Sequence, residues 1–438
     1  MFLIPIIQAE AASNQNLFVS AENSLFHNRF SGSMVVEVVI RDSNLQDTDE
    51  GKGEPDVTLN GKSLRMVQST DGNWYAYFAN VDKAKIADST QSATSGKGLD
   101  FGVFCSRDTA SSVFGISLSE TDGFAVPSSG LTTFTNGNSS FLSCTGTPDS
   151  TNLNNVVRNA RSINTNPNIL PGQIGLNPNA WPLIQLFSFG DVTIQYNAGG
   201  NPQSVVLEYD ESANISLNLD RNLYPQNSEV FLTVNDFQLN QDPTDEDSWT
   251  FKINSPVGTF YQAYDDSGSN SANGNAGLVN LIPYLSNLGF QDNGKLLVTL
   301  GNIIELKSND EQPSTSISDG SSTFSQIVTL VESGPNSGIF DSADDNDESI
   351  IAILSDAPRG QTGEIEYNQK SISVLTGSST SSVSINEPIL TVGGGSKSLK
   401  PGTKFPVVLF DPDQNINSGA EDDLDVFRDT SLIPTLKI

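Results

Sequence analysis

The sequence has only one histidine, His27, in 438 residues. Zinc sites built from several His or Cys ligands, and Ser–His–Asp triads, therefore lack their usual parts. The neighbours of His27 in the chain, Leu25, Phe26 and Asn28, offer it no carboxylate partner. A lone histidine is more often a packing or surface residue, so we predict that the chain is not an enzyme. Carboxylate pairs are frequent, however, and residue types alone leave a glycosidase dyad open.

Basic residues are also scarce. The chain has 22 Lys and Arg against 52 Asp and Glu, a formal net charge of −30. Such a polyanion repels nucleic acid and anionic lipid and attracts cations, so we expect no nucleic-acid partner. Two explanations of the charge stay open: it keeps the chain soluble, or some of its acidic clusters hold divalent cations.

Long apolar runs are missing as well. No stretch approaches the ~20 apolar residues that a membrane-spanning helix needs, so we expect no direct membrane span. Residues 1–12 read MFLIPIIQAEAA, a short apolar run followed by a small-x-small pattern, which predicts a signal-peptide remnant. An apolar first strand is the alternative. We therefore expect an exported protein that works outside the cell, at its surface.

Cysteine is limited to one pair, Cys105 and Cys144. A single pair in an exported chain predicts one disulfide, and two buried free thiols are the alternative. In the chain-entropy model, closing a loop of about 40 residues stabilises the fold by about 4 kcal/mol.

Short β-branched and aromatic runs, separated by turn residues, recur throughout the chain. Residues 57–67 place two such runs around Asn60-Gly61, the strongest short-range hairpin signal. Residues 74–78 read WYAYF, an aromatic strand, and similar runs continue to residues 405–410. We predict an all-β fold of tandem immunoglobulin-like β-sandwich domains with a few short inserted helices.

Helical spacing is confined to two segments. Residues 278–288 carry leucines at helical intervals and are followed by Gly289 at the position of a C-terminal cap. Residues 155–163 are the second candidate.

Soft boundaries near residues 188 and 377 divide the chain into domains. Residues 13–188 are predicted to form a first β-domain that holds the cysteine pair, and residues 189–377 a second β-domain region. Residues 378–438 are predicted to start a third, truncated immunoglobulin-like domain.

One construction recurs along the chain: an apolar strand runs into a loop rich in Asp and Asn. Ca²⁺ takes six to eight oxygen ligands in flexible geometry, and alternating Asp and Asn on a loop can supply them. Ordinary solvated turns, which use the same residues, are the alternative reading of each loop. The candidate structural Ca²⁺ ligands are Asp42, Asn44, Asp47 and Asp49 in the first loop, Asp236, Asn240, Asp242, Asp245 and Asp247 in the second, Asp411, Asp413, Asn415, Asn417, Asp422 and Asp423 in the third, and Asp341, Asp344, Asp345 and Asp347 in a fourth cluster.

Two N-x-Ser/Thr sequons, at Asn138 and Asn214, are candidate glycosylation sites on an exported protein. Chance alone also produces such sequons. Asn138 lies in a Gly/Ser-rich stretch and is the better candidate.

Several runs resemble a known family. Residues 53–88, GEPDVTLNGKSLRMVQSTDGNWYAYFANVDKAKIAD, and residues 219–251, LDRNLYPQNSEVFLTVNDFQLNQDPTDEDSWTF, resemble the N-terminal region of surface-layer proteins from ammonia-oxidising archaea of the Nitrosopumilus kind. Residues 328–342, VTLVESGPNSGIFDS, resemble the signature of immunoglobulin-like surface-layer repeats. Residues 411–427 resemble the acidic opening of the next such repeat.

This resemblance implies a tandem chain of immunoglobulin-like domains that assembles with copies of itself into a two-dimensional lattice over the cell. It also implies dependence on divalent cations, glycosylation, and a longer protein of which this chain is an N-terminal fragment. We therefore expect a structural subunit of a porous, acidic, cation-binding surface layer that concentrates cations such as ammonium. A secreted multi-domain adhesin or glycan-binding β-sandwich protein is the alternative.

Overall fold

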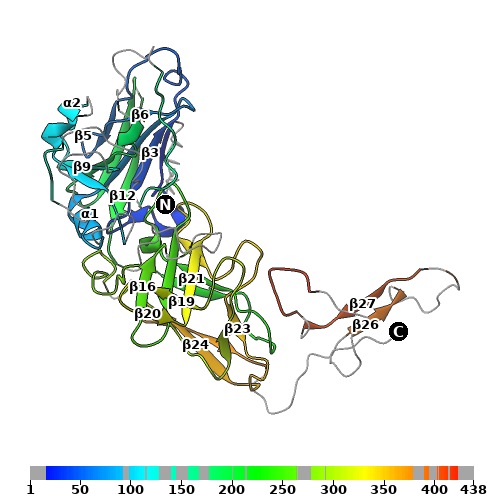
Figure 1. The fold of residues 1–438 in the computed structure, drawn as a ribbon. Coiled ribbons are helices and arrows are strands. Elements are labelled where there is room, and N and C mark those ends of the chain that lie inside the picture. Colours follow the sequence, from blue (N-terminus) through cyan, green and yellow to red (C-terminus); the bar gives the residue numbers. More distant parts are fainter. Residues whose placement is uncertain are drawn as a thin grey trace, which may run out of the picture.

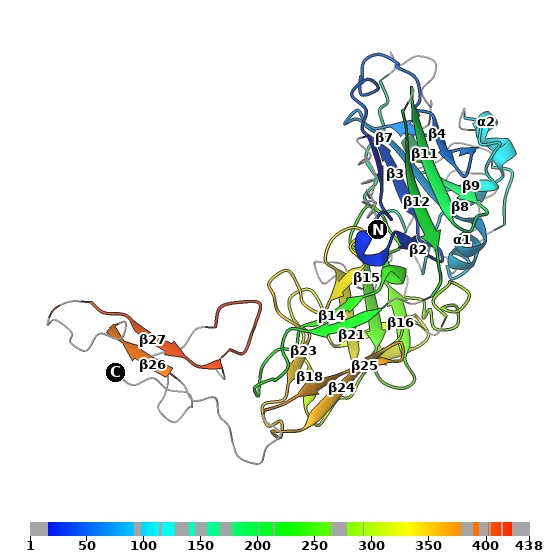
Figure 2. The same ribbon diagram turned by 180° about the vertical axis from the view of Figure 1, so that it is seen from behind.

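The computed structural model describes residues 16–91, 98–113, 116–127, 140–144, 156–166, 176, 178–199, 201–212, 215–262, 264, 278–291, 293–377, 389–393, 402, 404–412 and 415–422. Strands make up 37% of the chain and helices 7%, so the predicted all-β fold is confirmed. Figures 1 and 2 show two β-rich lobes joined end to end, with a separate hairpin beside the second lobe. The predicted signal-peptide remnant, residues 1–12, lies outside the described residues.

Lobe 1 contains two sheets that face each other. The larger sheet is seven-stranded, in the order β1-β3-β7-β10-β9-β8 with β6 beside β7, and the smaller runs β2-β12-β11-β4-β5. Their bounds are β1 (Leu17–Val19), β2 (Arg29–Phe30), β3 (Val36–Ile40), β4 (Val57–Leu59), β5 (Lys62–Ser63), β6 (Val67–Gln68), β7 (Trp74–Asn80), β8 (Val103–Cys105), β9 (Gly123–Val126), β10 (Ile184–Phe187), β11 (Val192–Ala198) and β12 (Asn201–Tyr209).

The aromatic strand β7 is buried along its whole length because it is central in its sheet and covered on both faces. It pairs antiparallel with β3 and parallel with β10. Trp74 and Phe78 join the core between the two sheets, whereas Tyr77 points into a second core on the other side. The α-helix α1 (Val81–Asp88) follows β7 directly and buries Val81, Ala84 and Ala87 in that second core.

The hairpin predicted at Asn60-Gly61 is present between β4 and β5. Both residues have positive φ, 49° and 79°, as a type I′ turn requires.

Lobe 2 is built on a six-stranded sheet in the order β13-β14-β22-β21-β15-β16. A three-stranded sheet, β17-β24-β25, and two strand pairs, β18-β23 and β19-β20, complete it. The bounds are β13 (Ser216–Leu219), β14 (Leu232–Asn235), β15 (Ser248–Lys252), β16 (Gly258–Tyr261), β17 (Leu296–Val298), β18 (Ile304–Leu306), β19 (Ser316–Ser318), β20 (Thr323–Ser325), β21 (Ile327–Glu332), β22 (Ile339–Asp341), β23 (Ile351–Ile353), β24 (Thr362–Tyr367) and β25 (Lys370–Leu375).

The short helical elements of the described chain besides α1 sit between strands. They are the 3-10 turns η1 (Ser24–Phe26), η2 (Arg107–Thr109), η3 (Pro178–Ala180) and η4 (Phe237–Leu239), and the α-helix α2 (Ala110–Val113).

The separate hairpin consists of β26 (Ile389–Val392) and β27 (Val407–Phe410). Apolar side chains are exposed on both of its faces: Ile389 and Phe410 are opposite each other at 61% and 63% exposure, and Leu390 on the other face is 53% exposed. This hairpin belongs to the predicted third domain, whose described residues also include the loop 415–422.

Strand pairing places the first division of the chain later than residue 188. β11 and β12 follow that residue, yet β11 pairs with β4 and β12 pairs with β2. Lobe 1 therefore extends through Tyr209, and the first strand of lobe 2 begins at Ser216. The second predicted division, near residue 377, falls just after β25, which ends at Leu375.

Neither predicted helix forms as a helix. Residues 282–289 form turns and not an α-helix. Pro283 lies within them and has no N–H to donate to a helical hydrogen bond. The buried Leu281, Leu285 and Leu288 nevertheless pack as the spacing predicted, and Gly289 has φ +98° at the predicted cap position. Residues 156–163 are irregular, and the backbone N–H groups of Arg158 and Asn159 bond to side chains of lobe 2. In the described part of the chain, no helix is long and apolar enough to cross a membrane.

Candidate functional site

The two lobes meet backbone to backbone at two glycines. A Cβ on Gly32 would lie 2.2 Å from the backbone oxygen of Leu288, and a Cβ on Gly289 would lie 3.0 Å from the Cα of Gly32. Both glycines also have positive φ, +56° and +98°, which L side chains rarely adopt. The contact is therefore possible only with glycine at both positions.

Hydrogen bonds and aromatic packing extend this junction. The N–H of Val35 donates to the backbone oxygen of Gln241 at 3.1 Å, and the Ser33 hydroxyl donates to the Gln241 side chain at 2.7 Å. The rings of Phe26 and Phe237 lie 5.6 Å apart across the junction. Buried apolar residues of both lobes belong to one continuous cluster, so the lobes are joined as one body and not as beads on a flexible linker.

An ion pair adds to the junction on the side of α1. The Lys83 ammonium lies 2.7 Å from Glu211 Oε1 and donates to the backbone oxygen of Asn287 at 2.9 Å.

The second acidic loop, residues 236–247, lies at this junction with most of its residues buried, and Arg158 of lobe 1 is its counter-ion. Arg158 Nε lies 3.5 Å from Asp242 Oδ2 and 3.6 Å from Asp245, and Nη1 lies 3.4 Å from Asp247 Oδ1. The backbone N–H of Arg158 also donates to Asp242 at 3.0 Å. Where the sequence predicted Ca²⁺, an arginine more than 80 residues away supplies the positive charge for this loop.

Burial sets the electrostatics of the loop. The side chains of Asp242 and Asp247 are fully buried, which raises the pKa of Asp242 to about 7 and that of Asp247 above its usual range, although Arg158 opposes both shifts. Burial alone would lower the pKa of Arg158, but Tyr261, Asp247 and Asp242 raise it. Asp236 is buried as well. Burial raises its pKa to about 6, although Tyr367 donates to its Oδ2 at 2.8 Å. Asn240, the remaining candidate of this loop, is also buried.

A cleft of about 500 Å³ opens beside Arg158. Polar and charged side chains line most of it, among them Asp245, Glu246, Glu332 and Asp345. Asp345 belongs to the fourth acidic cluster, so the cleft brings parts of the second and fourth acidic segments together.

The first acidic loop lies on lobe 1, away from the junction, and is organised by its own hydrogen bonds. Asp42 accepts bonds from the N–H of Asn44 at 2.9 Å and from the Tyr196 hydroxyl at 2.7 Å, which lower its pKa against the effect of burial. Asp47 accepts from the N–H of Asp49 at 2.9 Å and lies 3.6 Å from the Lys52 ammonium.

The third acidic loop contacts the fourth cluster. The side-chain amide of Asn417 donates to the backbone oxygen of Asp347 at 2.9 Å, and Asp422 accepts from the N–H of Asn417 at 3.2 Å. Asn415 joins lobe 2 through its backbone oxygen, which accepts from Arg221 at 2.9 Å. Asp411 lies at the end of β27; Asp413 and Asp423 fall outside the described residues.

Within the fourth cluster, Asp341 and Asp344 are held by different partners. Asp341 accepts from the Thr233 hydroxyl at 2.6 Å, while burial raises its pKa. Asp344 Oδ1 accepts from the N–H groups of Asn346 at 3.0 Å and Glu348 at 2.9 Å. In the part of the chain that the structure describes, no group of three or more His, Cys, Asp or Glu side chains is arranged to hold a metal ion.

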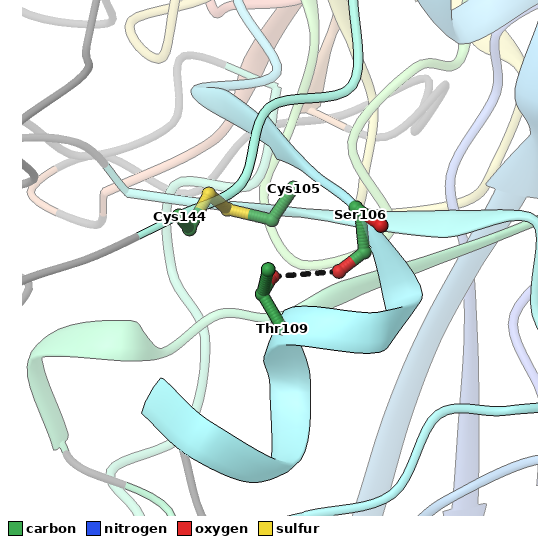
Figure 3. The surroundings of a disulfide bond; sticks show 4 residues. All are labelled: Cys105, Ser106, Thr109 and Cys144. Carbon is green, nitrogen blue, oxygen red and sulfur yellow. Dashed lines mark hydrogen bonds between the residues drawn. A yellow bond between two sulfur atoms is a disulfide. The ribbon is translucent and has the colours of Figure 1, made fainter.

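The predicted disulfide between Cys105 and Cys144 is present, with the two Cα atoms 5.5 Å apart. Figure 3 shows it beside the turn in which the Thr109 hydroxyl donates to the backbone oxygen of Ser106 at 2.7 Å. The candidate glycosylation sites Asn138 and Asn214 lie outside the described residues.

The three tryptophans are buried in the lobes. Trp74 and Trp249 are fully buried, and Trp181 packs against Tyr77 with ring centroids 5.2 Å apart. None of them forms an exposed platform of the kind that stacks on sugars.

Comparison with known proteins assigns no family: no protein-family model matches the chain, and no curated protein matches it.

Proposed function

We propose that the chain is a structural subunit of a porous, acidic, cation-binding surface layer outside the cell. The observation that carries the proposal is the rigid junction between the two lobes. Glycine contacts, a shared apolar core and a buried ion-pair network fix how one lobe follows the other. A subunit whose lobes keep one orientation can repeat the same contacts in every copy, which an ordered lattice requires.

Charge distribution supports the cation-binding part of the proposal. In the described part of the chain, Glu421 and Asp422 of the third loop and Asp345 and Asp347 of the fourth cluster are exposed. Exposed carboxylates at a net charge of −30 raise the local concentration of cations, including ammonium, and discourage anions. Ca²⁺ bound where the third loop meets the fourth cluster would relieve repulsion between them. The disulfide supports a location outside the cell, where such bonds persist.

The resemblance to surface-layer proteins of ammonia-oxidising archaea supports the same function. An adhesin or glycan-binding module receives less support, because such modules usually present exposed Trp or Tyr side chains and the three tryptophans here are buried.

Assembly of the purified chain tests the proposal. We expect electron micrographs of the chain incubated with Ca²⁺ to show ordered two-dimensional sheets, and chelation to disperse them. Calorimetric titration with Ca²⁺ should show binding under the same conditions. A chain that binds no Ca²⁺ and stays monomeric at every concentration tested would contradict the proposal. Binding to a glycan array without assembly would favour the alternative.

A further inference from the structure

The hairpin β26–β27 carries most of the exposed apolar side chains of the described chain. Of the twelve large apolar residues that are exposed there, seven lie between residues 389 and 410. Directly opposed residues of an antiparallel pair share a face, so the strand pairing divides these side chains between two faces. Ile389, Val408 and Phe410 lie on one face, and Leu390, Val392 and Val407 lie on the other. The hairpin therefore lacks the polar face that a half-exposed strand pair has.

This hairpin stands apart from the rest of the described chain. We call its described residues, 389–393 and 404–410, the arm. β26 and β27 pair with each other and with no further strand of the described residues. Figures 1 and 2 show them separate from both lobes. Because a lone two-stranded hairpin is only marginally stable in water, and because exposed apolar patches mark interaction sites, we expect the arm to bind a further surface.

The segment that follows the arm is fixed on lobe 2. The N–H of Glu229 donates to the backbone oxygen of Ile416 at 3.0 Å. Gly419 packs so closely on lobe 2 that a Cβ there would lie 2.8 Å from the Cβ of Asp347. One end of the arm is thus attached to its own subunit, while its apolar strands project away from the lobes.

The arm also differs from the rest of the chain in charge. Between residues 389 and 410 the sequence has three lysines and no Asp or Glu. The remaining residues therefore carry a formal charge of −33, against −30 for the whole chain. Lys404, at the start of the second half of the arm, is exposed. Charge complementarity attracts the arm to the acidic lobes of another copy and disfavours contact between two arms.

We propose that the arm docks on the lobes of a second copy of this chain, which bury its apolar side chains and face its basic charge with acidic groups. The contact joins two different surfaces, so the second copy keeps its own arm for a third, and the assembly can grow. This inference rests on the proposed function and deepens it by naming a surface through which copies join. An anionic membrane is a poorer partner, because the remaining charge of −33 is repelled by it.

Sedimentation of the full chain with Ca²⁺, over a range of protein concentrations, measures this contact. V408S/F410S removes two apolar side chains, 54% and 63% exposed, from one face of the arm. Losing the burial of both should weaken association at least about tenfold. F18S/V206S is the matched control, because it makes the same two replacements at residues that are 39% and 61% exposed on lobe 1. The control should associate as the parent does.

The outcomes separate this inference from the function on which it rests. If the parent assembles and V408S/F410S assembles equally well, the arm is not the contact and the inference is overturned, while the surface-layer proposal stands. If the parent stays monomeric at every concentration, both are wrong.

Hydrogen exchange of β26 and β27 in the parent identifies what covers the arm and needs no variant. Protection that rises with protein concentration supports docking on a second copy. Protection that does not change with concentration, whether strong or weak, refutes it, and strong protection then means that the chain covers its own arm. Binding of a monomeric parent to phosphatidylglycerol vesicles, lost in V408S/F410S, would assign the arm to a membrane and also refute docking on a second copy.

Discussion

Replacing Arg158 with glutamine is the most informative perturbation of the lobe junction. Arg158 contacts three carboxylates, and their exposure decides what each contact contributes. The pair with Asp245 is half exposed and is worth about 0–1 kcal/mol. Asp242 and Asp247 have fully buried side chains, and R158Q would leave both without a cation partner. Breaking a buried pair in this way costs about 3–5 kcal/mol.

Urea denaturation, followed by fluorescence of the buried tryptophans, gives the free energy of unfolding of parent and variant. We expect R158Q to lose about 3–5 kcal/mol, and hydrogen exchange to show the loss first in loop 236–247. R107Q is the matched control, because Arg107 is half exposed, lies 4.0 Å from an exposed Asp108, and should change stability by less than about 1 kcal/mol. A loss in R158Q no larger than in R107Q would refute our account of the junction.

Three further substitutions test other parts of the fold. G32A places a Cβ 2.2 Å from a backbone oxygen of the facing lobe and should lower the free energy of unfolding, measured by thermal melting, by about 2–4 kcal/mol. G199A should lower it less, because Gly199 also has positive φ but faces open space. Equal losses in the two variants would contradict a tight junction. Replacing Cys105 and Cys144 together with serine should lower the free energy of unfolding by about 2–5 kcal/mol, measured by denaturation, and an unchanged value would show that the disulfide carries no stability. Burial, together with the nearby carboxylate of Asp100, raises the pKa of Asp88 to about 8, so its contribution to stability is present at low pH and is lost as pH rises toward 8. The melting temperature of D88N should therefore depend less on pH between pH 5 and pH 8 than that of the parent. A melting temperature that changes with pH as steeply in D88N as in the parent would count against this.

The β-strands could be predicted from the sequence because their signals are local. The Asn60-Gly61 turn and the aromatic run at 74–78 each specify their conformation through neighbouring residues. The first division of the chain could not be predicted in the same way. β12 pairs with β2, which lies about 180 residues earlier in the chain, and the local sequence of neither strand indicates which strand it pairs with.

Helix α1 was missed because its buried face consists of small side chains, chiefly Ala84 and Ala87, which give no apolar stripe. The signal that could have found it is Asn80, whose side chain accepts from the N–H groups of Asp82 and Lys83 at the start of the helix.

The acidic loop 236–247 shows a different limit of the sequence. Its spacing of Asp and Asn predicted Ca²⁺ ligands, and the structure places the guanidinium of Arg158 against the same carboxylates. The ligand types alone do not distinguish a bound metal from a distant arginine, since both satisfy buried carboxylates. Only the fold brings Arg158 to the loop.

Imaging the envelope of cells that produce this protein tests the central claim most directly. Electron microscopy of purified envelopes, with the chain located by a bound antibody, should show a regular lattice that contains the chain and that is lost when Ca²⁺ is chelated. Envelopes without a lattice, or a lattice that persists unchanged after the protein is deleted, would contradict a role as a surface-layer subunit.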